Sequence, residues 1–200
     1  MELRRRAVGP WSMNAYALVC PETRASVLVD PGDDPETLEA MLSGTRPAAI
    51  LVTHAHPDHI GALVEMRRRL QVPVMAHGGG AVQADQQLFG GERLAVGRRH
   101  LRVHAAPGHT ADQLCFGVED RPDVIVGDTI FDGGPGKTWS AEDFQTTLTT
   151  LRRVVLSWSD DTVCHPGHGA AFRLGDVRPA VERFLAKDHG RFCGDATWEM

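Results

Sequence analysis

The segment Thr-His-Ala-His-Pro-Asp-His, residues 53–59, concentrates side chains that bind metal ions. His54 and His56 lie two residues apart, a spacing that in extended backbone turns both imidazoles to one side. The proline that follows turns the chain, so Asp58 and His59 are directed elsewhere. One loop can therefore supply ligands to two metal ions.

Three further segments place a histidine or an aspartate beside glycine at the end of a predicted strand, where glycine lets backbone and metal approach closely. Nitrogen donors with few carboxylates and no cysteine suit Zn²⁺, Fe²⁺ or Mn²⁺ in an open, catalytic site, because structural zinc usually recruits thiolates. A carboxylate in such a set can bridge two cations about 3.5–4 Å apart. The three residues are His109 in Pro-Gly-His-Thr, Asp128 in Gly-Asp-Thr and His168 in Pro-Gly-His-Gly.

The elements that must position these residues alternate between short strands and helices. One expected helix carries Phe144, Leu148, Leu151 and Val155 at i, i+4, i+7 and i+11, a single apolar stripe that would lie on a sheet. The pattern predicts an α/β fold. Apolar runs predict strands at residues 13–20, 26–30, 48–53, 72–76, 102–105, 113–118, 124–128 and 162–165. Helices are predicted at residues 35–42, capped by Asp34, and at residues 60–70, 141–157 and 177–187.

The composition restricts the class of protein. The chain has 200 residues, 42% hydrophobic and 24% charged, which predicts a single globular domain over residues 1–200, with the structure of residues 188–200 left open. The net charge of −5 disfavours nucleic acid and anionic lipid as partners. The four cysteines are scattered without a CxxC pair, which indicates free thiols in a reducing compartment. Without an apolar segment suited to a signal peptide or a membrane helix, we expect a cytoplasmic protein.

The ordered ligand-type residues resemble the metallo-β-lactamase superfamily, and most closely its glyoxalase II-like hydrolases. The resemblance runs from about Met13 to Leu185 and includes Asp30 in Val-Asp-Pro-Gly and the two Pro-Gly-His turns. It implies a four-layer αββα sandwich with the metals at one edge, between the two sheets.

The same resemblance implies a site for two divalent cations, with zinc as the first expectation and iron or manganese as alternatives. Asp128 would bridge the cations, and Asp30 would orient a ligand imidazole or the loop from behind. A hydroxide shared by the cations would attack an activated carbonyl, and Asp58 would also orient that hydroxide. The first cation would be held by His54, His56 and His109, and the second by Asp58, His59 and His168.

The function implied is a dinuclear metal-dependent hydrolase acting on a small-molecule thioester or related activated ester. Lys137 and Trp139 match the stretch of glyoxalase II that contacts the glutathione part of the substrate. Each has a structural alternative. Lys137 would be a solvated surface lysine, and Trp139 would form a hydrophobic staple with Phe144, because Ser140 and Asp143 resemble a capping box.

Departures from the family keep other activities open. The helical extension that grips glutathione in glyoxalase II proper is not expected after the helix at residues 177–187. A mono-iron persulfide dioxygenase using His54, His109 and Asp128 shares the pattern and is the main alternative. A lactonase, a β-lactamase and a nuclease are disfavoured, respectively, by the missing tyrosine after the last ligand motif, by the bridging aspartate and by the net charge. A non-catalytic, metal-stabilised binding protein is least favoured, because unused buried charges are costly.

Overall fold

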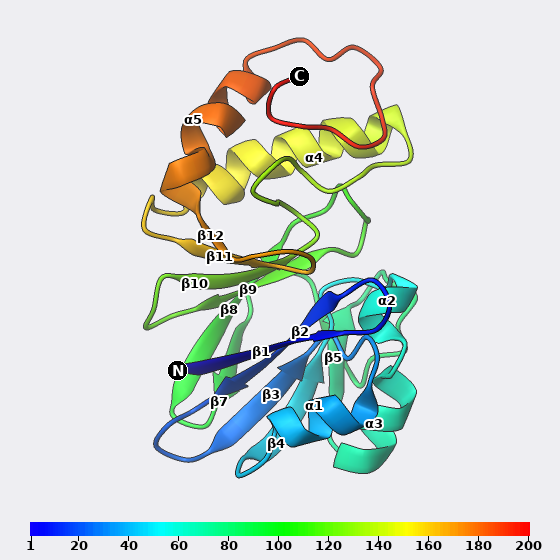
Figure 1. The fold of residues 1–200 in the computed structure, drawn as a ribbon, viewed down its shortest axis with the longest axis vertical. Coiled ribbons are helices and arrows are strands. Elements are labelled where there is room, and N and C mark those ends of the chain that lie inside the picture. The colour runs from blue at the N-terminus through cyan, green and yellow to red at the C-terminus, as the bar shows by residue number, and fades with distance from the viewer.

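Two six-stranded sheets face each other in the computed structural model, which describes residues 1–200 (Figure 1). In the first sheet the strands follow chain order, antiparallel from β1 to β3 and parallel from β3 to β6. These strands are β1 (Glu2–Val8), β2 (Met13–Val19), β3 (Ala25–Val29), β4 (Arg46–Leu51), β5 (Val74–His77) and β6 (Gln86–Leu88).

The second sheet also follows chain order and is antiparallel except where β10 pairs with β11. Because β8 and β10 are both antiparallel to β9, they run in the same direction and end at the same edge. The strands are β7 (Arg93–Val96), β8 (Arg99–Ala105), β9 (Leu114–Val118), β10 (Asp123–Gly127), β11 (Val163–Pro166) and β12 (Phe172–Arg173).

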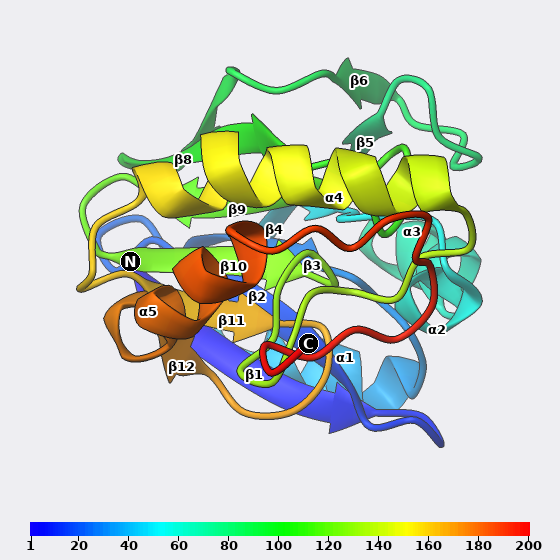
Figure 2. The same cartoon turned by 90° about the horizontal axis from the view of Figure 1, so that it is seen from above.

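Helices cover the outer face of each sheet (Figures 1 and 2). The helices α1 (Pro35–Met41) and α3 (Leu63–Leu70) pack on the first sheet, and α4 (Ala141–Arg153) and α5 (Leu174–Leu185) pack on the second. A third apolar cluster, which includes Tyr16, Leu18 and Phe116, fills the space between the sheets. The four-layer αββα sandwich expected from the resemblance is therefore confirmed. No helix combines the length and the apolar character needed to cross a bilayer.

The apolar stripe of α4 packs as predicted, with Phe144, Leu148, Leu151 and Val155 all buried against the second sheet. The predicted helix does not run unbroken to residue 157. It ends at Arg153, and a single 3-10 turn, η1 (Val155–Ser157), follows.

The helix predicted at residues 60–70 is wrong in its boundaries. A short helix, α2 (Pro57–Ile60), begins earlier, because proline is favoured in the first turn of a helix. The chain then breaks before α3, and the backbone N–H of Ala62 donates to the carbonyl of Pro31 instead of continuing α2. Gly61 allows this close approach, since a Cβ there would lie 2.4 Å from the carbonyl oxygen of Gly32.

Two other local expectations need correction. Asp34 precedes α1 but does not cap it with its side chain, because its left-handed backbone turns the carboxylate toward the backbone N–H of Gly9, 3.1 Å away. The strand β1 was not predicted, because Arg4 to Arg6 lack apolar alternation. The strand forms because its backbone pairs along β2 while the arginine side chains stay at the surface or partly buried.

The cap of α4 gives a first prediction. The Oγ of Ser140 accepts a hydrogen bond from the backbone N–H of Asp143 at 3.0 Å. Ser140→Ala should lower the free energy of unfolding by about 1 kcal/mol, because it leaves that N–H without its acceptor. Equilibrium urea unfolding of the metal-free protein measures the change.

Thr149→Ala is the matched control, because Thr149 lies in the exposed middle of α4 and only back-bonds to the carbonyl of Gln145. Equal destabilisation by both substitutions would contradict a capping role for Ser140.

Candidate metal centre

The seven ligand-type side chains predicted from the sequence come together at one edge of the two sheets. They leave the ends of four strands that run toward this edge, β4, β8, β10 and β11. Three overlapping groups each offer ligand atoms within 4.8 Å of one another. The groups are His54 with His56 and His109, then Asp58 with His59 and His168, and between them His54 with His59 and Asp128.

The first group is a triangle of imidazoles. Nδ1 of His56 lies 3.0 Å from Nε2 of His54 and 2.9 Å from Nε2 of His109. In the second group, Nε2 of His168 lies 3.0 Å from Oδ2 of Asp58. Each triangle has the donor composition of a transition-metal site with nitrogen ligands in the majority.

Asp128 joins the two groups. Its Oδ2 lies 3.6 Å from Nε2 of His109 and 3.8 Å from Nε2 of His168, and its Oδ1 lies 3.5 Å from Nε2 of His59. One buried carboxylate thus faces imidazoles of both triangles, which is the arrangement needed to bridge two cations.

Two buried atoms test whether this set fits metal ions. Nε2 of His59 and Oδ1 of Asp128 are both buried and have no hydrogen-bond partner. Such atoms are costly unless something satisfies them. Gly167 leaves the space open, because a Cβ there would lie 2.2 Å from Oδ1 of Asp128 and 2.5 Å from Cε1 of His59. A divalent cation would satisfy both atoms, so the residues fit the metal site that the sequence predicts.

In His59 and His109, the ring nitrogen that faces away from the cluster has a hydrogen-bond acceptor. Oδ2 of Asp30 lies 2.9 Å from Nδ1 of His59, and Asp30 also accepts hydrogen bonds at 2.7 Å from the N–H and the hydroxyl of Thr53. Nδ1 of His109 lies 2.8 Å from the carbonyl oxygen of Lys137. An N–H donated to these acceptors leaves the other ring nitrogen free to bind a metal ion. The position of buried Asp30 matches the orienting role expected for it.

Burial and neighbouring charges act in opposite directions on these groups. Burial, reinforced by the surrounding histidines, lowers the pKa of His54 well below its ordinary value and keeps the ring neutral. Burial would also lower the pKa of His59, but the carboxylates of Asp30 and Asp128 outweigh it and raise that pKa to about 10. Burial would raise the pKa of Asp128, yet the charged ring of His59, 3.5 Å away, lowers it on balance.

Lys137 and Trp139 lie beside the cluster in different ways. The Trp139 ring is 58% exposed, and its centroid lies 5.3 Å from those of His56 and His109. Phe144 instead packs against other aromatic rings, among them Phe192 at 4.9 Å. The Ser140 cap thus forms as predicted, whereas the Trp139 indole lies against the metal-binding cluster.

The side chain of Lys137 pairs with a residue that the sequence did not single out. Its Nζ lies 3.2 Å from Oδ2 of Asp195, and both side chains are largely exposed. An exposed pair of this kind contributes little to stability and exchanges readily with solvent.

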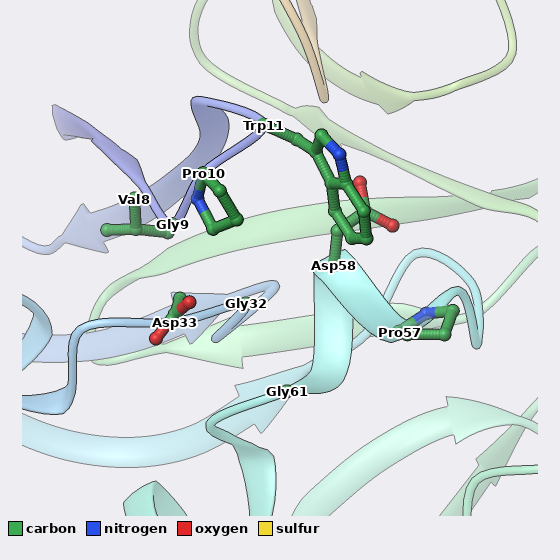
Figure 3. Close-up of a pocket in the computed structure, with 9 residues that line it drawn as sticks. All are labelled: Val8, Gly9, Pro10, Trp11, Gly32, Asp33, Pro57, Asp58 and Gly61. Carbon is green, nitrogen blue, oxygen red and sulfur yellow. The ribbon is translucent and has the colours of Figure 1, made fainter.

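Three residues near the site were missed by sequence reasoning. Trp11, in the turn between β1 and β2, is 66% exposed and accepts a hydrogen bond from Nδ1 of His168 at its carbonyl oxygen, 3.3 Å away. Together with Asp58 it lines a cavity of about 210 Å³ (Figure 3). Asn14 and Tyr16 donate to the carbonyl of Pro166 at 3.0 and 2.6 Å and so hold the turn that carries His168. Of these three residues, only Trp11 could have been noticed from its residue type.

His165, whose role the sequence left open, lies outside the cluster. It is buried, and its Nε2 lies 2.7 Å from Oδ1 of Asp123. This pair satisfies two buried polar groups within the second sheet.

Comparison with known proteins agrees with this geometry. The sequence model described as "Metallo-beta-lactamase superfamily" matches residues 8–168. The chain belongs to the metallo-beta-lactamase superfamily. A curated relative, the probable metallo-hydrolase YqgX of Bacillus subtilis, is 33% identical over 84% of this chain and 90% of its own length. A hydroxyacylglutathione hydrolase of Anaeromyxobacter dehalogenans is 36% identical over 73% of this chain.

The match to that hydrolase covers only 58% of its length, so this chain spans little more than half of it. The superfamily and these relatives support a metal-dependent hydrolase of the glyoxalase II-like type, and the His and Asp cluster indicates divalent metals.

Solved structures share the fold. A di-iron form of TTHA1623 is 32% identical, with a TM-score of 0.75 over 88% of this chain and 96% of that one. ETHE1 from Myxococcus xanthus is 26% identical, with a TM-score of 0.80 over 94% and 86% of the two chains. The BLEG-1 B3 metallo-beta-lactamase is also 26% identical, with a TM-score of 0.81 over 89% and 97%.

The contacts of Asp30 predict the result of removing its charge. Asp30→Asn should weaken zinc binding by about 10- to 100-fold, because His59 loses the carboxylate that orients its Nδ1–H. Competition with a chromophoric chelator measures the affinity. Asp33→Asn, at an exposed carboxylate in the same loop, is the control and should bind zinc as the parent protein does. Equal affinity in the two variants would contradict an orienting role for Asp30.

The raised pKa of His59 predicts proton release on metal binding. Below a pKa of about 10 the metal-free ring carries a proton, which must leave before Nε2 can bind a cation. At about pH 8, zinc binding should release more protons from the parent protein than from Asp30→Asn, because His59 in the variant keeps only the carboxylate of Asp128 beside it. The difference should vanish above the raised pKa. Calorimetry in buffers of different ionisation enthalpy measures it, and equal release in the two proteins would contradict the charge assignment.

Proposed function

We propose that the protein is a dinuclear metal-dependent hydrolase that cleaves thioesters or related small activated esters. The observation that carries the proposal is the position of Asp128, whose two oxygens face His59 in one triangle and His109 in the other. A bridging carboxylate suits hydrolysis by two cations. Relatives named hydroxyacylglutathione hydrolase support a thioester as the substrate class.

The chemistry divides between the cations and the chain. When bound, two divalent cations, zinc being our first choice, would supply a nucleophile from water at neutral pH and polarise the carbonyl under attack. Asp58, whose carboxylate is partly exposed beside His168, can accept a hydrogen bond from that nucleophile and so orient it. The buried ligand side chains hold fixed positions, so little reorganisation is needed during reaction.

The mouth of the site suits a small molecule with an apolar part and an anionic end. The exposed indole of Trp139 gives an apolar wall beside His56 and His109. Lys137, two residues before it, can pair with a carboxylate of the substrate in place of Asp195. The net charge of −5 disfavours a nucleic acid partner. A glutathione thioester has the required anionic end.

The direct test is hydrolysis by protein of known metal content. Elemental analysis should find about two equivalents of zinc, iron or manganese per chain. The same protein should cleave S-lactoylglutathione and a neutral acyl thioester, and a chelator should abolish both activities. Two bound cations without cleavage of either thioester would overturn the proposed reaction.

A mono-iron persulfide dioxygenase, which is an oxidoreductase, is the second candidate function. His54, His109 and Asp128 lie in the cluster and have the two-histidine, one-carboxylate composition that binds non-haem iron. The likeness to ETHE1 is compatible with this candidate. One equivalent of iron, oxygen consumption with a persulfide and no thioester hydrolysis would favour it.

Lys137 predicts a difference between charged and neutral substrates. Lys137→Ala should raise KM for S-lactoylglutathione by about 3- to 10-fold with kcat unchanged, because it removes binding that ground state and transition state share. The neutral thioester should be unaffected.

Asp195→Asn is the complementary variant. It should lower KM for the anionic substrate by about 2-fold, since Lys137 loses only a weak, exposed competitor. Steady-state kinetics on both substrates measure the two effects. Equal changes in KM for the charged and the neutral thioester would refute the proposed contact.

A further inference from the structure

One peptide group beside the metal centre is held from both sides. The carbonyl oxygen of Lys137 lies 2.8 Å from Nδ1 of His109. The N–H of the same peptide group, carried by Thr138, donates to the carbonyl of Gly194 at 3.1 Å. The N–H of Gly194 returns a hydrogen bond to the carbonyl of Thr138 at 2.9 Å. The orientation of the carbonyl that faces His109 is therefore coupled to residue 194.

Trp198 anchors the segment 193–200 to the loop that follows β10. The indole is buried, and its Nε1–H donates to the carbonyl of Asp132 at 2.7 Å. The backbone N–H of Trp198 donates to the carbonyl of Gly133 at 3.1 Å. Its ring also packs against Phe184 of α5, with centroids 5.4 Å apart. The segment thus ties the loop between β10 and α4 to the helical layer (Figure 2).

The loop that receives these bonds has two backbone hydrogen bonds of its own, from the N–H of Phe131 to the carbonyl of Gly134 and from the N–H of Gly136 to the carbonyl of Thr129. Residues 132–137 read Asp-Gly-Gly-Pro-Gly-Lys, and three glycines give the backbone wide conformational freedom. Gly134 also permits close packing on the segment, because a Cβ there would lie 2.2 Å from the carbonyl oxygen of Ala196. The bonds from the segment therefore add to the few contacts that restrict this glycine-rich loop.

We propose that the segment 193–200 positions His109 for metal binding through the Lys137–Thr138 peptide group. The inference rests on the proposed metal site, in which His109 holds one of the two cations, and is independent of the substrate. Trp198 and Gly194 are positioning residues. They fix the carbonyl that keeps the proton of His109 on Nδ1 and leaves Nε2 for the cation.

The test uses metal-free and zinc-loaded protein in four forms besides the parent. Two forms remove the anchor: a chain ended after Phe192, and Trp198→Ala. Trp198→Phe keeps an aromatic ring in the apolar cluster and loses the N–H donor together with part of the ring volume. Trp158→Ala is the matched control, because Trp158 packs against the same cluster and its Nε1 has no partner. Thermal unfolding of each form shows whether it remains folded.

Two readouts separate positioning of His109 from general stability. In the metal-free protein, the ¹⁵N spectrum of the imidazoles should show His109 as the Nδ1–H tautomer in the parent and the control, with that preference lost when the anchor is removed. In chelator competition, one zinc equivalent should weaken by about 10- to 100-fold without the anchor and by less in Trp198→Phe, while the other keeps its affinity. If the anchor-free forms unfold, Trp198→Phe carries the test.

Retention of both zinc affinities and of the His109 tautomer in all folded variants would overturn the inference. Equal weakening by Trp158→Ala would also overturn it, because the effect would then be general destabilisation. If the parent protein binds no metal, the proposed function fails, and the metal-free tautomer still tests whether the segment positions His109.

Discussion

The site depends on one buried carboxylate, Asp128, which lies between two groups of imidazoles. A buried charge is costly unless it is paired, and Asp128 faces His109 of one group and His59 and His168 of the other. Its Oδ1 and the facing Nε2 of His59 have no hydrogen-bond partner, and a bound cation would satisfy both atoms. This contact forms because strand ends from both sheets converge here and because Gly167 leaves space beside the two atoms.

Acceptors from distant parts of the chain hold the imidazoles around that carboxylate. The carboxylate of Asp30, after β3, orients His59, and the carbonyls of Lys137 and Trp11 face His109 and His168. These supports lie in three separate loops, so the ligand geometry depends on how the two sheets and the loops pack together. The superfamily fold supplies this frame, and the loops at its edge distinguish one member from another.

The ligand-type residues could be predicted from the sequence because they follow residue type and spacing, and the four-layer sandwich could be predicted because those residues resemble a known superfamily. His54 to His59 follow the end of a strand, and the α4 stripe has helical periodicity. The supports at Trp11 and Gly194 could not be predicted, because they act through backbone carbonyls that every residue carries. The strand β1 was missed because its three consecutive arginines lack the apolar alternation of a strand. The break between α2 and α3 at Gly61 was missed because it depends on a contact with residues 31 and 32.

Anomalous scattering from crystals at the absorption edge of the bound metal tests whether Asp128 bridges two cations. We expect two peaks about 3.5–4 Å apart, one among His54, His56 and His109 and the other among Asp58, His59 and His168, with Asp128 between them. A single peak at full occupancy, or two peaks of which only one contacts Asp128, would contradict it.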